Sequence, residues 1–252
     1  MWRNRTNSYF LRPSYISLLI NELEQELSDA LNINIERIAS KVQKIGFSCK
    51  KCGHCCRLVF GDNRVLLTQK DILEIAEHTG LSKDEIVAPM LPEDVGTFSF
   101  SSGIPDIAGF EIDTEGNIHT FGWMLRRKSN GDCSFIEDEK ECRNRCKIYD
   151  FRPMLCRTYP FYLESMKLQV SKCEGLGSKI SEPESIKLAQ DVVRRYLEEI
   201  KDTISLYKKF QGINTDHGDC GLDIAARRAK EGLIVYVVHD SDGTHRIIEK
   251  FQ

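Results

Sequence analysis

The chain has 252 residues, of which 41% are hydrophobic and 29% are charged, and its formal net charge is −3. This composition is that of an ordinary globular protein that can bury a sizeable core, as one large domain or two small ones. The slightly negative charge argues against a polyanion-binding surface over the whole protein, so nucleic acid is an unfavoured partner unless a local basic patch binds it. Ten cysteines in this length are too sparse for a small secreted disulfide scaffold.

The first residues contain no secretory signal and no membrane span, because the apolar run Tyr15–Ile20 is too short for either. We therefore expect a cytoplasmic protein. Thiols stay reduced in that compartment, so a cysteine cluster there binds metal or is redox-active rather than disulfide-bonded.

Residues 14–45 carry apolar side chains at steps of three or four, which predicts one long helix or two. Gly46 supplies the end of this helical segment. The residues that follow are expected to form a loop.

That loop holds the most informative feature of the chain, a C-x2-C-x2-C-C cluster that spans Cys49, Cys52, Cys55 and Cys56. Two thiols separated by two residues can bind one soft metal centre, and here the pattern is repeated at once. Bacterial ferredoxins present three thiolates to a [4Fe–4S] cluster with the same C-x2-C-x2-C spacing. Zinc could use the same thiols, with or without His54, so the residues predict a metal centre and leave both metals open.

Residues 57–60 read as a short strand, and two capped helices follow. Thr68 and Asp71 open the first helix, which is expected to end at Gly80. The pair Ser82 and Glu85 is a capping box for the second, which is expected to end near Pro89.

The segment 91–136 changes to short runs rich in glycine, serine and aromatic residues. The runs 109–113 and 118–125, joined by residues 114–117, predict an antiparallel hairpin. A second turn at 129–132 delivers Cys133 to the start of another short strand.

A second group of thiols extends from Cys133 to Cys173 and lies among basic residues. Guanidinium groups beside a thiolate cluster would offset its negative charge, and they could also bind an anion such as phosphate. We therefore take Arg152 and Arg157 as candidate cofactor-binding residues.

The last part of the chain is expected to begin with a long amphipathic helix over 183–210. A short helix over 221–231 should follow, and then a hairpin formed by 233–238 and 246–251.

The first cluster, together with the C-x-I-Y-x-x-R-P-x-x-C-R-x-Y-P pattern that runs from Cys146 to Pro160, resembles the CxxCxxCC cysteine-cluster proteins of the YkgJ type. These are described as zinc- or iron-chelating and are often labelled iron–sulfur proteins, and flagellin lysine methylases share the arrangement. The resemblance covers residues 46–177, including the Leu-Thr-x-x-Asp segment at 67–71. It implies eight metal ligands: Cys49, Cys52, Cys55, Cys56, Cys133, Cys146, Cys156 and Cys173. It leaves Cys142 as a weaker candidate and Cys220 as a plain thiol.

We therefore predict an α+β metalloprotein in which helices surround a small antiparallel sheet and a cysteine-rich core, with a C-terminal helix and hairpin. The expected domains are 1–45, 46–180 and 181–252. The favoured function is to hold one or two iron–sulfur clusters, of the 4Fe–4S type, for a redox or electron-transfer role with a protein redox partner, with iron–sulfur oxidoreductase as the enzyme class if there is a reaction. The alternatives are a zinc-stabilised binding module and, by resemblance alone, a methyl-transfer enzyme.

Overall fold

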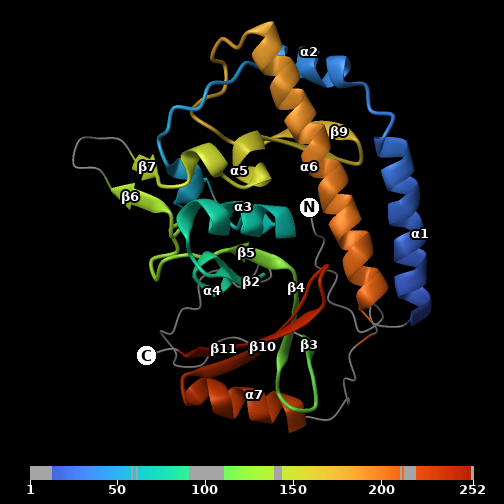
Figure 1. Cartoon of the computed structure of the whole chain (residues 1–252), viewed down its shortest axis with the longest axis vertical. Coiled ribbons are helices and arrows are strands. Elements are labelled where there is room, and N and C mark those ends of the chain that lie inside the picture. Colours follow the sequence, from blue (N-terminus) through green and yellow to red (C-terminus); the bar gives the residue numbers. More distant parts are fainter. Residues whose placement is uncertain are drawn as a thin grey trace. The chain divides into compact units, whose positions relative to one another are not determined.

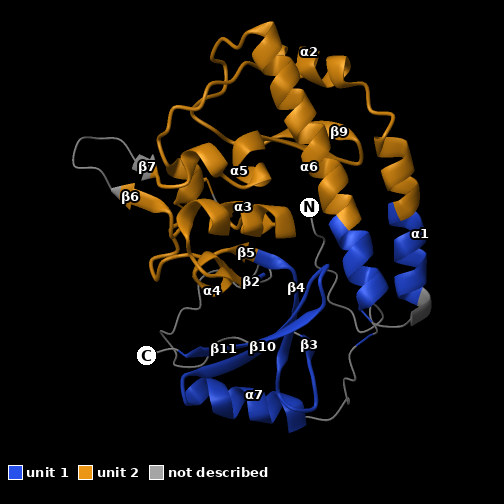
Figure 2. Cartoon of the chain, viewed as in Figure 1, with its two compact units in different colours: residues 1–23, 89–123, 202–252 blue, residues 24–88, 124–201 orange. Residues whose placement is uncertain are grey.

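A computed structural model of the chain describes residues 13–57, 59–60, 62–90, 111–138, 144–210, 212 and 220–250. It combines helices with small sheets and ends in a helix and a strand hairpin, so the predicted α+β class is confirmed (Figure 1). The chain forms two compact units, each discontinuous in sequence (Figure 2). Unit 1 comprises 1–23, 89–123 and 202–252, and unit 2 comprises 24–88 and 124–201.

The predicted helical segment at 14–45 is two helices, α1 (Pro13–Ala30) and α2 (Ile35–Ile45). Asn34 caps α2, because its side chain accepts a hydrogen bond from the Arg37 amide. Gly46 ends α2 as predicted, with a φ of 73° and its amide bonded to the Val42 carbonyl.

The two capping boxes also form as predicted, on α3 (Gln69–Thr79) and α4 (Lys83–Ile86). The predicted end of the second helix is wrong, since α4 is one turn long and strand β2 (Val87–Pro89) follows it. The predicted strand at 57–60 is also wrong: its described residues lie in turns, and the nearest strand is β1 (Leu66–Leu67).

Unit 2 holds two antiparallel strand pairs near the cysteines. Strand β6 (Ile136–Asp138) pairs with β7 (Asn144–Cys146), and β8 (Phe161–Glu164) pairs with β9 (Lys167–Val170). Between β7 and β8 lie the 3-10 turn η4 (Tyr149–Phe151) and the short helix α5 (Met154–Thr158). A third sheet has the order β1-β5-β2, with β5 at Trp123–Leu125.

The long helix α6 (Glu182–Lys209) matches the amphipathic segment predicted over 183–210. Its buried stripe contains Ala189, Val193, Tyr196, Ile200 and Ile204, which recur at steps of three or four. No helix within the described residues is both long and apolar enough to cross a membrane.

Unit 1 is built on a four-stranded sheet in the order β11-β10-β4-β3. Both predicted hairpins are confirmed: β3 (Glu111–Ile112) with β4 (Ile118–Phe121), and β10 (Leu233–His239) with β11 (Thr244–Lys250). The two hairpins join through β10 and β4, which run parallel, so the sheet is mixed. Helix α7 (Cys220–Lys230) packs against β10 and β3.

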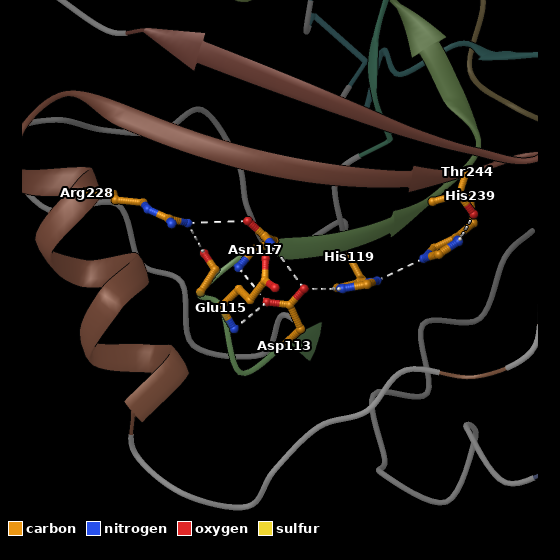
Figure 3. Close-up of polar contacts among 8 residues, drawn as sticks. Asp113, Glu115, Asn117, His119, Arg228, His239 and Thr244 are labelled. Atoms are coloured by element: carbon orange, nitrogen blue, oxygen red, sulfur yellow. Dashed lines mark hydrogen bonds and ion pairs between the residues drawn. The ribbon is translucent and has the colours of Figure 1, made fainter.

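A chain of hydrogen bonds crosses the strands of unit 1 (Figure 3). Asp113 Oδ2 lies 3.1 Å from His119 Nε2, and His119 Nδ1 lies 2.8 Å from His239 Nε2. His239 Nδ1 in turn lies 3.1 Å from Thr244 Oγ1. Because a carboxylate only accepts, neutral His119 donates through Nε2 and accepts through Nδ1, which makes His239 donate through Nε2 and accept from the Thr244 hydroxyl. Burial, with the neighbouring His119, lowers the pKa of His239 from 6.5 to about 4.

Candidate metal centre

The first cysteine cluster lies on a tightly turned loop in unit 2. Lys51 and Gly53 both adopt left-handed backbone conformations, with φ of 54° and 75°, and the 3-10 turn η2 (His54–Cys56) follows. The Cys56 amide closes this turn on the Gly53 carbonyl at 2.9 Å. The adjacent thiols of Cys55 and Cys56 lie 3.9 Å apart, Sγ to Sγ.

The chain before this loop pairs with the segment that follows Cys173. The Ser48 amide donates to the Gly175 carbonyl at 3.1 Å, and the Gly177 amide donates to the Gly46 carbonyl at 3.1 Å. A Cβ at position 175 would lie 2.3 Å from the Ser48 carbonyl oxygen, so only glycine allows this approach. The pairing places Cys173 beside the first cluster.

A second contact joins the end of the first cluster to the turn before Cys133. The Cys133 backbone amide donates to the Cys56 carbonyl at 2.9 Å, and the side-chain Nδ2 of the buried Asn63 donates to the same oxygen at 3.2 Å. Beside them, an ion pair of 2.6 Å links Arg57 to Asp132. The thiols of Cys56 and Cys133, far apart in sequence, are therefore held on neighbouring segments.

The remaining two predicted ligands lie on short regular elements. Cys146 is the last residue of β7 and pairs with Ile136 of β6, whose amide bonds the Cys133 carbonyl at 3.1 Å. Cys156 is the central residue of α5. The strand pair and the short helix thus carry these thiols to the same part of unit 2.

Electrostatic coupling shows that the thiols of both motifs share one neighbourhood. Burial raises the pKa of Cys133 to about 11, and the charges of Cys146 and Cys55 add to the effect. Burial also raises the pKa of Cys146, Cys156 and Cys173, and Cys55 contributes to each. The Cys55 pKa is itself raised, chiefly by its contact with Cys56. The charges of Cys49 and Cys52 act on Cys173, so the structure brings together all eight predicted thiols.

The two candidate arginines take different places. The positive charge of Arg152 partly opposes the rise in the pKa of three thiols, Cys55, Cys146 and Cys156. The Arg152 guanidinium lies 3.8 Å from the centre of the Tyr149 ring, and the Lys51 ammonium lies 4.4 Å from the same ring. Arg157 instead pairs with Glu74 of α3 at 3.2 Å.

Three residues named in the sequence analysis remain: His54, Cys142 and Cys220. His54 lies on the cluster loop, 3.7 Å from Glu174 through Nδ1 and edge-on to Phe60. Cys220 is an exposed thiol at the start of α7 in unit 1, and Cys142 lies outside the described residues.

The donor set fits a thiophilic metal, because nine cysteines in the described part of the chain are free thiols and eight of them are gathered. Among the described residues, no three His, Cys, Asp or Glu side chains already stand in a geometry that could hold one ion. The thiols are therefore gathered but not converged on one point.

Sequence reasoning missed the residues that hold these segments together. Gly175 and Asn63 carry no metal-binding chemistry, so nothing in the sequence indicates their role. Asp71 was noted as a helix start, although its buried carboxylate also bonds the Met154 amide of α5. Its place in the Leu-Thr-x-x-Asp segment was the one signal available.

Comparison with known proteins identifies a matching protein family and a distant relative. A family model described as "CxxCxxCC: Putative zinc- or iron-chelating domain" matches residues 48–174, which are 127 of the 252 residues. The uncharacterized protein MJ0661 of Methanocaldococcus jannaschii is 25% identical over 164 residues, covering 61% of this chain and 71% of that protein. No solved structure matches the chain.

Proposed function

Because the chain belongs to the CxxCxxCC family of zinc- or iron-chelating domains, we propose that its cysteine core holds iron–sulfur in a redox or electron-transfer role. The proposed ligands are Cys49, Cys52, Cys55, Cys56, Cys133, Cys146, Cys156 and Cys173. When bound, such a group accepts and releases single electrons.

One observation supports the proposal above the others: the thiols of two separate motifs lie in one neighbourhood, joined by the bond from the Cys133 amide to the Cys56 carbonyl. There Cys55 of the first motif raises the pKa of Cys133, Cys146 and Cys156. Two 4Fe–4S clusters use eight thiolates, and two four-thiolate zinc sites would use the same number. The C-x2-C-x2-C spacing of Cys49, Cys52 and Cys55, which bacterial ferredoxins use for a 4Fe–4S cluster, favours iron–sulfur. Gathering eight thiols destabilises their charged forms together, and a bound cationic cluster removes that penalty.

The residues around the thiols would serve such a centre in two ways. Four thiolates on an oxidised 4Fe–4S core leave a net negative charge, which the nearby Arg152 offsets. Phe47 and Phe161 pack edge to face, with ring centres 5.8 Å apart, and Phe161 is fully buried. Apolar packing of this kind beside a metal centre limits the access of water.

The first experiment is to purify the protein without oxygen and to measure iron, zinc and acid-labile sulfide per chain. Equal iron and sulfide, about eight of each, would support two 4Fe–4S clusters, and about four of each would support one. About two zinc ions without sulfide would contradict iron–sulfur and support the zinc-stabilised module instead.

Single substitutions test the ligand set. Cys52→Ser and Cys146→Ser should each lower bound metal, because each removes one proposed thiolate. Cys220→Ser is the matched control, since Cys220 is an exposed thiol of unit 1, and it should keep the wild-type metal content. Equal metal in all three variants would refute the assignment.

We also propose an acidic redox protein as the partner, in the cytoplasm, where thiols stay reduced. Cys49 and Cys55 are the exposed thiols of the core, and the exposed Lys50 and Lys51 lie between them in sequence. A basic rim at the exposed edge of a redox centre attracts an acidic surface and speeds its association at low salt. Replacing both lysines by glutamine should slow electron exchange with an acidic ferredoxin-type protein and weaken its salt dependence. An unchanged rate would refute the docking site.

A further inference from the structure

Asp71 joins α3 to the cysteine-bearing helix α5 through one buried carboxylate. The Asp71 side chain is 3% exposed. Its Oδ2 accepts from the Thr68 amide at 3.1 Å and from the Thr68 hydroxyl at 2.8 Å, which is the capping box of α3. Its Oδ1 accepts from the Met154 amide at 2.9 Å, in a contact that is buried and spans 83 residues of sequence.

This contact satisfies a donor that α5 cannot satisfy by itself. Met154 is the first residue of α5, so its amide has no partner within the helix, and Pro153 before it has no amide to donate. A buried amide without a partner is costly, so Asp71 fixes where α5 begins. Two residues later, α5 carries Cys156.

The other end of α5 is held as well. The Thr158 side chain is fully buried, and its hydroxyl accepts from the Arg195 guanidinium of α6 at 2.5 Å while it donates to the Met154 carbonyl at 2.9 Å. Arg195 is in turn paired with Glu199 at 3.2 Å. Cys156 therefore lies in one helical turn that is fastened at both ends by buried charged side chains.

We propose that Asp71 is a positioning residue for the Cys156 thiol: it acts through the Met154 amide to aim α5 into the cysteine core. The inference rests on the proposed metal-binding function, and it extends it by giving the Leu-Thr-x-x-Asp segment a role in the centre. A helix cap alone would stabilise α3 without any effect on Cys156. The bond to Met154 is what separates the two roles.

The chain offers matched variants for the test. Asp71→Ala removes both the cap and the Met154 contact, whereas Thr68→Val removes the capping hydroxyl and keeps the Asp71 contact to Met154. Glu85→Ala removes the corresponding capping carboxylate on α4, which bonds Ser82 alone among the described contacts. The readouts are metal per chain, the unfolding midpoint, and the alkylation rate of each cysteine in the metal-free protein by mass spectrometry.

We expect all three variants to unfold more easily than the wild type, but only Asp71→Ala to change the centre. Its metal affinity should fall about 10- to 100-fold, as for other residues that orient ligands. In the metal-free protein, alkylation of Cys156 should become about 10-fold faster through local opening of α5, while Cys133 keeps its rate.

Two results would overturn the inference: the same loss of metal and the same Cys156 rate in Thr68→Val, or no selective change at Cys156 in Asp71→Ala. If Asp71→Ala does not fold, Asp71→Asn replaces it, because a carboxamide has one acceptor oxygen and cannot serve both Thr68 and Met154. If the wild type proves to bind no metal, the proposed function fails, but the alkylation pattern still decides whether Asp71 positions Cys156.

Discussion

Acidification should destabilise unit 1 through His239, and the size of the effect follows from its surroundings. The pKa of His239 is lowered from 6.5 to about 4: burial contributes most, His119 and His245 add to it, and Asp240 opposes it. Between these two pH values the unfolded chain binds a proton that the folded chain does not, so stability falls as the pH falls from 6.5 to 4. At about 1.4 kcal/mol per pKa unit, the upper limit is about 3 kcal/mol, and solvent that reaches part of the ring reduces it to about 1–2 kcal/mol.

The assay is urea unfolding of the metal-free protein at pH 7 and at pH 5, followed by tryptophan fluorescence. The chain has two tryptophans, so a Trp2→Phe background leaves Trp123 as the reporter. Trp123 is buried in unit 1, and its indole donates to Asp240 at 2.6 Å, next to His239. His239→Asn should lower stability at pH 7 but lose much less between pH 7 and pH 5. His78→Asn, at an exposed position of α3, controls for the loss of an imidazole as such.

One result would refute the role of His239. If wild type and His239→Asn lose the same free energy of unfolding between pH 7 and pH 5, His239 is not the group that takes up the proton. The directed chain from Asp113 to Thr244 would then not hold in the form that the distances indicate.

Two further predictions concern buried contacts. Gly175→Ala should lower both metal content and the unfolding midpoint, because its Cβ would lie 2.3 Å from the Ser48 carbonyl oxygen; Gly177→Ala, with open space around its Cβ, should cost only about 1 kcal/mol of backbone strain and keep the metal. Equal metal loss in both variants would show that the steric contact is unimportant. Trp123→Phe leaves the buried Asp240 carboxylate short of a donor and should destabilise the protein by about 1–3 kcal/mol in thermal unfolding, whereas an unchanged melting temperature would contradict the role of that bond.

The local elements of the fold could be predicted because short-range chemistry decides them. The capping boxes at Thr68 and Ser82 and the apolar stripe of α6 all form where the sequence indicates. The failures were also local in cause. Strand β2 begins directly after the single turn of α4, where a β-branched run continued the apolar pattern, and residues 57–60 turn instead of extending.

The candidate metal centre likewise has a part that the sequence predicts and a part that only the fold determines. The spacing of the first cluster, Cys49 to Cys56, by itself predicted a metal centre, because a C-x2-C pair is short enough to reach one metal. The ligands of the second motif were implied by the family resemblance. Where those thiols meet depends on contacts between residues far apart in the chain: the Ser48 amide on Gly175, the Cys133 amide on Cys56, and the Asp71 carboxylate on Met154. Such backbone amides carry no sequence signature, since any residue but proline offers one. The parallel pairing of β10 with β4 could not be predicted for the same reason, because backbone groups make it. Residue chemistry sets what the site can bind, and only the folded chain decides which segments bring its ligands together.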